Sequence, residues 1–143
     1  MSLNRPGIHE YAMNIAKAVA TRSTCFRKKV GAVIMRDKKI LSTGYNGAPT
    51  GLKDCFELGL CSKEEGCLSV HAEQNAIIFA AKNGVRVEDA AIYVTHAPCL
   101  QCARMIINAG LSTVYYEKEN KDMSGLRFLL SYGPRTIWLK NEK

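Results

Sequence analysis

The sequence lacks a hydrophobic run long enough to span a membrane, because no stretch approaches about 18 consecutive apolar residues. It also lacks the pattern of a secretory leader, since residues 1–10 are polar and are interrupted by Pro6 and Gly7. No internal repeat, low-complexity tract or linker divides its 143 residues. We therefore expect a cytoplasmic protein without a membrane partner, folded as a single domain over residues 1–143.

Charge and cysteine content narrow the class of protein further. The formal net charge is +7, which fits a solvated basic surface or an attraction for phosphate groups and does not distinguish nucleotides from polynucleotides. The densest basic runs are 27–29 and 36–39, and a solvated face is the simpler interpretation of both. Six cysteines in a cytoplasmic chain are better explained as thiols or metal ligands than as disulfides.

Two short motifs, His-Ala-Glu at 71–73 and Pro-Cys-Leu-Gln-Cys at 98–102, carry the chemistry. Cys99 and Cys102 are three residues apart and would face the same way on the first turn of a helix, where the helix dipole favours thiolates. With His71 they form a three-ligand set for Zn²⁺. Structural zinc sites usually have four protein ligands, whereas three leave a position for water, whose pKa falls from about 15.7 to about 7. The pattern predicts catalytic zinc.

Glu73 is placed to carry protons, because it lies two residues beyond His71 and is not needed as a ligand. Each motif has an ordinary explanation alone: a lone histidine is often a core or surface residue, and a lone C-x-x-C can be a redox or structural-zinc motif. Together they resemble the H-x-E and P-C-x-x-C signature of zinc-dependent nucleobase deaminases, which attack C4 of cytosine or C6 of adenine. We therefore predict that Glu73 is the catalytic residue of a hydrolytic deaminase.

Hydrophobic periodicity predicts a mixed α/β protein. Helices are expected at 8–20, 71–83, 99–109 and 122–131, and strands at 30–35, 40–45, 91–95, 113–116 and 136–139. This order implies a three-layer α/β/α fold, in which a mixed sheet of about five strands is covered by helices on both faces. The zinc ligands would then arrive near the carboxyl ends of neighbouring strands, where open α/β sheets bind their ligands.

Beyond the metal motifs, the sequence resembles the cytidine and deoxycytidylate (dCMP) deaminase family. The resemblance runs from about residue 22 to residue 116 and is carried by segments 29–34, 44–51, 71–77 and 93–95. It implies a cytidine deaminase-like fold and a CMP/dCMP-type zinc deaminase domain that hydrolyses dCMP to dUMP and ammonia, supplying dUMP for thymidylate synthesis. Its expected partners are small-molecule nucleotides rather than nucleic acids.

The glycine-rich loop at 44–51 adds most of the information on the substrate. Its glycines would let backbone N–H groups approach an anionic ligand, although G-x-N-G is also common in ordinary turns. By resemblance, Asn46 would hydrogen-bond the sugar or phosphate, and Ala72 and Val33 would contact the base unless they are simply core residues. The further substrate-binding candidates are Asn75, whose alternative role is to satisfy nearby backbone groups, and His96, which would border the pocket.

The cysteines outside the catalytic pair are Cys25, Cys55, Cys61 and Cys67. Many microbial and phage dCMP deaminases carry a second, structural zinc in the region before the catalytic histidine, and these four positions match that pattern by resemblance. A closed zinc site would order the segment 53–68, which lacks an apolar period. Because the spacing of six residues is wider than in compact zinc fingers, free core thiols and disulfides remain alternatives.

Phosphate recognition and regulation rest on the resemblance alone. Family members often place a tyrosine that binds the substrate phosphate where this chain has Asn120, so Lys118 or Lys121 could supply the charge instead. Members are usually homohexamers that dCTP activates and dTTP inhibits, and Mg²⁺ could accompany the regulatory nucleotide. The positions matched to regulation are Phe79, Lys82, Gly44 and Gly47.

Two other functions fit part of the sequence. A tRNA adenosine deaminase shares both zinc motifs and the basic charge, but the 44–51 loop and the cysteine-rich insert at 53–68 favour a mononucleotide substrate. Binding of a polynucleotide would weaken steeply with added salt. A catalytically silent, zinc-stabilised nucleotide sensor would need no proton carrier, and Glu73 argues against it.

Overall fold

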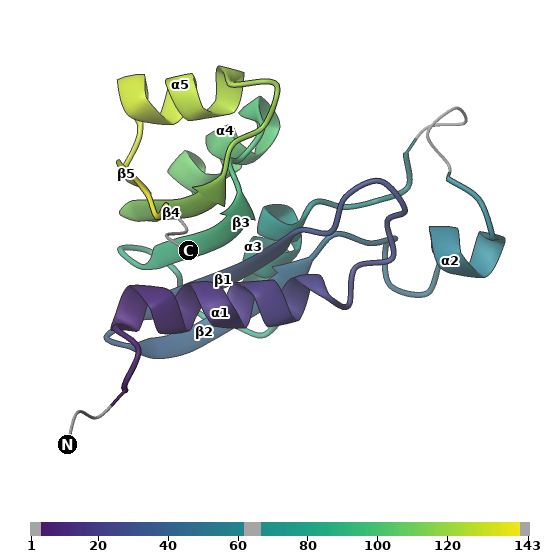
Figure 1. Ribbon diagram of the computed structural model, residues 1–143, viewed down its shortest axis with the longest axis horizontal. Helices are drawn as coiled ribbons and strands as arrows, with labels where there is room; N and C mark the ends of the chain where they lie inside the picture. The colour runs from purple at the N-terminus through teal and green to yellow at the C-terminus, as the bar shows by residue number, and fades with distance from the viewer. Residues whose placement is uncertain (1–3, 62–66, 141–143) are drawn as a thin grey trace.

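The computed structural model describes residues 4–61 and 67–140 and contains the α/β elements in the order that the sequence predicts (Figure 1). The elements are α1 (Ile8–Ala20), β1 (Gly31–Arg36), β2 (Lys39–Tyr45), α2 (Cys55–Leu58), α3 (Ala72–Lys82), β3 (Ala91–His96), α4 (Leu100–Asn108), β4 (Thr113–Lys118), α5 (Ser124–Tyr132) and β5 (Arg135–Trp138). The predicted range of α1 is confirmed, and the ends of the other predicted elements shift by at most two residues.

Helix α2 is the one element here that the sequence analysis does not predict. Its single turn depends on local capping: the Asp54 carboxylate accepts a hydrogen bond from the Glu57 backbone N–H at 2.8 Å. Gly59 then ends the turn in the left-handed conformation, with φ of 71°. Capping of this kind can support a helix too short to show hydrophobic periodicity.

The strands form one mixed sheet, as the sequence predicts, and the structure gives their order as β2-β1-β3-β4-β5. Strand β1 is antiparallel to both β2 and β3, whereas β3, β4 and β5 are mutually parallel. One expectation is corrected: the two ligand-bearing helices do not follow neighbouring strands, because β1 lies between β2 and β3. Since β2 and β3 are both antiparallel to β1, they still run in the same direction and end at the same edge of the sheet.

Helices cover both faces of the sheet, which gives the predicted three layers (Figure 1). Helix α1 packs on one face, where Ala12 and Met13 meet Val33 and Tyr93. Helices α3, α4 and α5 cover the other face around buried side chains such as Ile92. Each fully buried aliphatic side chain stabilises the fold by about 1.5–3 kcal/mol, so these cores fix the helix positions. Within the described residues, no helix combines the length and hydrophobicity needed to cross a membrane.

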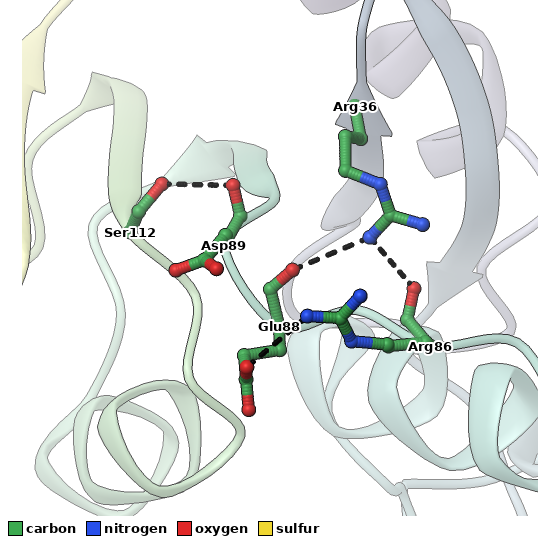
Figure 2. Close-up of polar contacts among 5 residues, drawn as sticks. All are labelled: Arg36, Arg86, Glu88, Asp89 and Ser112. Carbon is green, nitrogen blue, oxygen red and sulfur yellow. Dashed lines mark hydrogen bonds and ion pairs between the residues drawn. The ribbon is translucent and has the colours of Figure 1, made fainter.

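A polar network anchors the loop that leads into β3 (Figure 2). The Arg36 guanidinium of β1 donates hydrogen bonds to the carbonyl oxygens of Arg86 and Glu88, at 3.0 and 3.3 Å. The Ser112 hydroxyl donates to the carbonyl oxygen of Asp89 at 3.1 Å. These contacts fix the start of β3, the strand whose carboxyl end leads to the cysteine motif.

Candidate active site

The N-termini of α3 and α4 supply the predicted zinc ligands. His71 is the N-cap residue of α3 and Cys99 is the N-cap residue of α4, and both have extended backbone conformations. The segment before α3 is fixed by a two-way backbone pairing between Gly47 and Val70, with N···O distances of 3.1 and 2.8 Å. The His71 N–H also donates to the Gln74 side chain at 2.9 Å. Backbone contacts on both sides therefore fix the histidine.

His71, Cys99 and Cys102 come together as a cluster. The His71 Nδ1 atom lies 3.3 Å from the Cys102 sulfur and 3.5 Å from the Cys99 sulfur, and all three ligand atoms lie within 4.8 Å of one another. A nitrogen and a sulfur bound to one tetrahedral Zn²⁺ lie about 3.6 Å apart, given bond lengths of about 2.0 and 2.3 Å. Both the donor set and its spacing therefore fit zinc.

Hydrogen bonds among the three ligands shift their pKa values, and this coupling suits cation binding. The pKa of Cys99 is lowered to about 4, chiefly because Cys102 and then His71 hydrogen-bond its thiolate. The hydrogen bond to the Cys99 thiolate, followed by burial, raises the pKa of Cys102. The pKa of His71 is raised, chiefly by its hydrogen bond to Cys99. A divalent cation favours neutral imidazole and two thiolates, so its binding would release the protons held here.

Glu73 lies in the first turn of α3 and is only 5% exposed. Burial raises its pKa, and hydrogen bonding to backbone N–H and the charge of His71 act in the opposite direction. A carboxylate with a raised pKa can both accept and return a proton near neutral pH, which is the property required of a general base that later acts as an acid. The buried position of Glu73 beside the ligand cluster matches the predicted role.

A cavity of about 300 Å³ opens onto the ligand cluster. It is lined by Cys25, Arg27, Lys28, Val30, Asn46, Cys67, Ser69, His71, Ala72, Glu73, His96, Ala97, Cys99 and Asn120. This volume lies at the lower end of the range for small-molecule sites. The cavity therefore combines the predicted catalytic residues with a rim that contains two cations.

Those two rim cations, Arg27 and Lys28, were not predicted as site residues, although the sequence shows them as part of a basic run. Lys118 and Lys121, the cations suggested by their proximity to Asn120, do not line the cavity. Asn120 does, and its side-chain oxygen accepts a hydrogen bond from the Lys28 ammonium at 2.5 Å. The sequence signal that could have identified these two cations was the basic run at 27–29, which lies just before β1.

The substrate-binding candidates have different surroundings. Asn46 lines the cavity, but its side chain binds backbone: it donates to the Lys28 carbonyl at 2.7 Å and accepts from the Val30 N–H at 2.9 Å. Asn75 lies outside the cavity lining and donates to the Tyr45 carbonyl at 2.8 Å, which is its alternative role.

Ala72 and His96 line the cavity, whereas Val33 does not. Val33 packs on the opposite face of the sheet, in the core covered by α1, and Val30 reaches the cavity in its place. The predicted contact between Val33 and the base is therefore not part of the proposed site. His96 is outside the metal-binding cluster, and burial together with Lys28 and Lys118 lowers its pKa to about 4.

The cysteines predicted for a structural zinc are distributed over the insert and the cavity. Cys25 and Cys55 are buried, Cys61 is half-buried and Cys67 is exposed. Cys25 and Cys67 line the cavity. In the part of the chain that the structure describes, metal-ligand side chains gather in a group of three only at His71, so the second zinc stays a prediction.

The positions matched to regulation lie on α3 and on the segment that packs against it. Phe79 is half-buried and Lys82 is exposed on α3, and both are outside the cavity lining. Gly44 is buried where β2 crosses α3, and a Cβ atom there would lie 2.4 Å from the Ala72 carbonyl oxygen. Gly47 pairs with Val70 as described above. The close packing at Gly44 accounts for a glycine at this position, and the regulatory roles stay predictions.

The mixed sheet, the His/Cys/Cys cluster and the buried glutamate are the features expected of a zinc-binding deaminase. The family model described as "Cytidine and deoxycytidylate deaminase zinc-binding region" matches residues 6–118. The chain therefore belongs to the cytidine and deoxycytidylate deaminase family.

Similarity to individual relatives supports this family assignment. ComE operon protein 2 of Bacillus subtilis (strain 168) is 43% identical over 120 residues, which cover 83% of this chain and 64% of that protein. The deoxycytidylate deaminase of Mycobacterium phage D29 is 38% identical over 130 residues, which cover 82% of this chain and 100% of the phage protein. The dCMP deaminase of cyanophage S-TIM5, solved with dCMP and dUMP, has a TM-score of 0.84 and 33% identity, covering 96% of this chain and 100% of that one.

Proposed function

We propose that this protein deaminates dCMP to dUMP and ammonia by hydrolysis. The observation that carries the proposal is the buried carboxylate of Glu73 beside the His71, Cys99 and Cys102 cluster, in a cavity with Arg27 and Lys28 on its rim. The cluster supports hydrolytic chemistry at a nucleobase, and the cations support an anionic substrate. The names of the phage relatives, which specify dCMP, support the same substrate.

The chain's own residues account for the proton transfers. Zinc bound to His71, Cys99 and Cys102 would supply acidified water at neutral pH. Glu73 accepts the proton of the attacking water and delivers it to N3 of the cytosine ring as the oxygen adds to C4. Glu73 then takes the remaining proton from the oxygen on C4 and delivers it to the amino group, so that the C4 carbonyl forms, the C4–N bond breaks and ammonia leaves. One carboxylate thus serves as base and then as acid. The atoms of dCMP and water are all accounted for in dUMP and ammonia.

The finer predictions extend this proposal. The protein would act in the cytoplasm as a homohexamer and supply dUMP for thymidylate synthesis, with dCTP as activator, dTTP as inhibitor and Mg²⁺ accompanying the regulatory nucleotide. A second zinc would be held by Cys25, Cys55, Cys61 and Cys67. These properties rest on the family resemblance, and each can be measured separately from the deamination reaction.

Ammonia release tests the proposed reaction. Purified zinc-loaded protein is offered dCMP, deoxycytidine, dCTP and a tRNA anticodon stem-loop in parallel, with and without dCTP or dTTP as effectors. We expect rapid release from dCMP, with a shallow dependence on salt because one phosphate is contacted. Release from the RNA alone, with a steep salt dependence, would identify a polynucleotide deaminase instead. Nucleotide binding without any release would identify a sensor.

A further inference from the structure

The loop at 97–99 joins β3 to α4 and ends at the first metal-binding cysteine. Ala97 is only 2% exposed and Pro98 is fully buried. Proline has no backbone N–H, so position 98 cannot donate a hydrogen bond that would hold the loop. Buried backbone groups need partners, and the position of the loop therefore depends on what bonds the N–H and the carbonyl oxygen of Ala97.

Both of these groups are bonded by one short stretch of chain at the end of β4. The Ala97 N–H donates to the carbonyl oxygen of Lys118, the last residue of β4, at 2.7 Å. The Ala97 carbonyl oxygen accepts a hydrogen bond from Nδ2 of Asn120. The first bond extends the pairing of β3 with β4, whereas the second depends on a side chain. Asn120 therefore completes a two-point attachment that lies two residues before Cys99.

Lys28 determines which way the Asn120 amide points. The Lys28 ammonium donates to Asn120 Oδ1 at 2.5 Å. An ammonium has donors only, so the amide oxygen has to face Lys28, and the donor Nδ2 is left to face the Ala97 carbonyl. An amide satisfies both neighbours at once. A carboxylate of the same size would keep the bond to Lys28 but would set an oxygen against the carbonyl oxygen of Ala97.

Helix α5, which follows Asn120, packs directly on the same loop. Gly125 is buried in the first turn of α5. A Cβ atom at this position would lie 2.1 Å from the Pro98 carbonyl oxygen and 2.4 Å from the Cys99 carbonyl carbon. Such distances are far below van der Waals contact, so the absence of a side chain permits this approach. The chain from 118 to 125 thus contacts the loop at each of its three residues.

The two cysteines differ in how much they depend on this loop. Cys102 lies within α4, whereas Cys99 is the N-cap residue and has an extended backbone conformation. The helix therefore fixes the Cys102 sulfur, and the 97–99 loop fixes the Cys99 sulfur. The Cys99 sulfur lies 3.5 Å from Nδ1 of His71, a spacing that a shift of the loop would alter.

We propose that Asn120 is a positioning residue for the metal site: by holding the Ala97 carbonyl, it keeps the Cys99 sulfur where zinc can bind. The inference rests on the proposed function only through the metal site and does not depend on which nucleotide is deaminated. Groups that orient metal ligands without touching the metal change metal affinity by about 10- to 100-fold when they are replaced. Asn120 acts in this way through the backbone of the cysteine loop.

Zinc affinity, measured by competition with a chromophoric chelator, tests the inference without turnover. Asn120→Asp keeps an acceptor for Lys28 and loses the donor to Ala97, so we expect the Kd for zinc to rise about 10- to 100-fold. The added negative charge alone would strengthen cation binding, so charge cannot explain a weaker affinity. Asn14→Asp is the matched control, because Asn14 is an exposed amide on α1 outside the cavity lining, and it should match wild type.

Two further measurements separate positioning from folding. The thiolate-to-metal absorption of Co²⁺-loaded protein should change in Asn120→Asp, while the Tm of the metal-free protein stays close to that of wild type. A merely structural role would lower that Tm and leave the zinc affinity of the folded protein unchanged. If the aspartate variant does not fold, Asn120→Ser, which is too short to reach Ala97, is judged by the same outcomes.

Equal zinc affinities for wild type and Asn120→Asp would overturn the inference even if dCMP is turned over rapidly. A wild-type protein that binds zinc but deaminates only deoxycytidine or RNA would overturn the proposed function instead.

Discussion

Replacement of Gly44 by alanine should displace α3 and, with it, Glu73, the proposed catalytic residue. A Cβ atom at position 44 would lie 2.4 Å from both the Ala72 carbonyl oxygen and the Ala76 amide nitrogen, and 3.0 Å from the Asn75 carbonyl carbon. Ordinary contacts begin near 3.4 Å. The α3 backbone would therefore have to retreat by about 1 Å, because backbone atoms cannot relieve an overlap by changing rotamer.

The expected loss of stability is about 3 kcal/mol, at the upper end of the range for overpacked cores, or about 10 °C in Tm. The same displacement should lower kcat for dCMP about 100-fold, since misplacing a catalytic group by about 1 Å has that effect. Thermal unfolding and steady-state kinetics measure both quantities. Gly7→Ala is the matched control, because no heavy atom lies within 4 Å of a Cβ there. A Gly44→Ala protein with wild-type Tm and kcat would refute the reasoning.

Three further predictions concern the site. Glu73→Gln keeps the side-chain shape but cannot accept a proton, so turnover should fall about 10²- to 10⁴-fold while elemental analysis finds unchanged zinc; substantial turnover would remove Glu73 from this role. His71→Ala should lower the zinc content by one ion per chain, and an unchanged content would contradict the ligand assignment. The pKa of His96 in the folded protein is lowered to about 4, below its usual 6.5. As the pH falls, His96 is therefore protonated in the unfolded chain at a higher pH than in the folded protein. The stability contributed by neutral His96 is therefore present above about pH 6.5 and lost toward pH 4. His96→Gln should flatten the Tm profile in that window, and superimposable profiles would contradict this.

The catalytic part of the site could be predicted because it is local in sequence. Glu73 lies two positions after His71, and Cys102 lies three positions after Cys99, so the sequence alone places each pair at the start of one helix. The structure then brings the two helix N-termini to one edge of the sheet.

The face on which a strand residue lies could not be predicted for β1. Five of its six residues are buried, so no polar alternation indicates which side chains face α1 and which face α3. Val33 therefore looked as suitable for substrate contact as its neighbours, and the structure places it on the α1 face. Periodicity reveals a half-buried strand, but it carries no information on a strand buried on both sides.

The cationic rim of the cavity could not be predicted because it is formed by tertiary contacts. Lys28 and Asn120 are 92 residues apart, and neither belongs to a motif that specifies the other. Asn46 was predicted from the glycine-rich loop, but its hydrogen bonds to the backbone at Lys28 and Val30 emerge only when β2 and β1 pair. In sequence, the basic run at 27–29 resembles any solvated basic stretch.

In the proposed reaction, oxygen from water replaces the amino group of dCMP. The most direct measurement is mass spectrometry of the nucleotide product after zinc-loaded protein is incubated with dCMP in water enriched in heavy oxygen. We expect dUMP carrying one heavy oxygen atom at C4, with ammonia released in equal amount. Unchanged dCMP, under conditions in which the protein is folded and contains zinc at His71, Cys99 and Cys102, would contradict it.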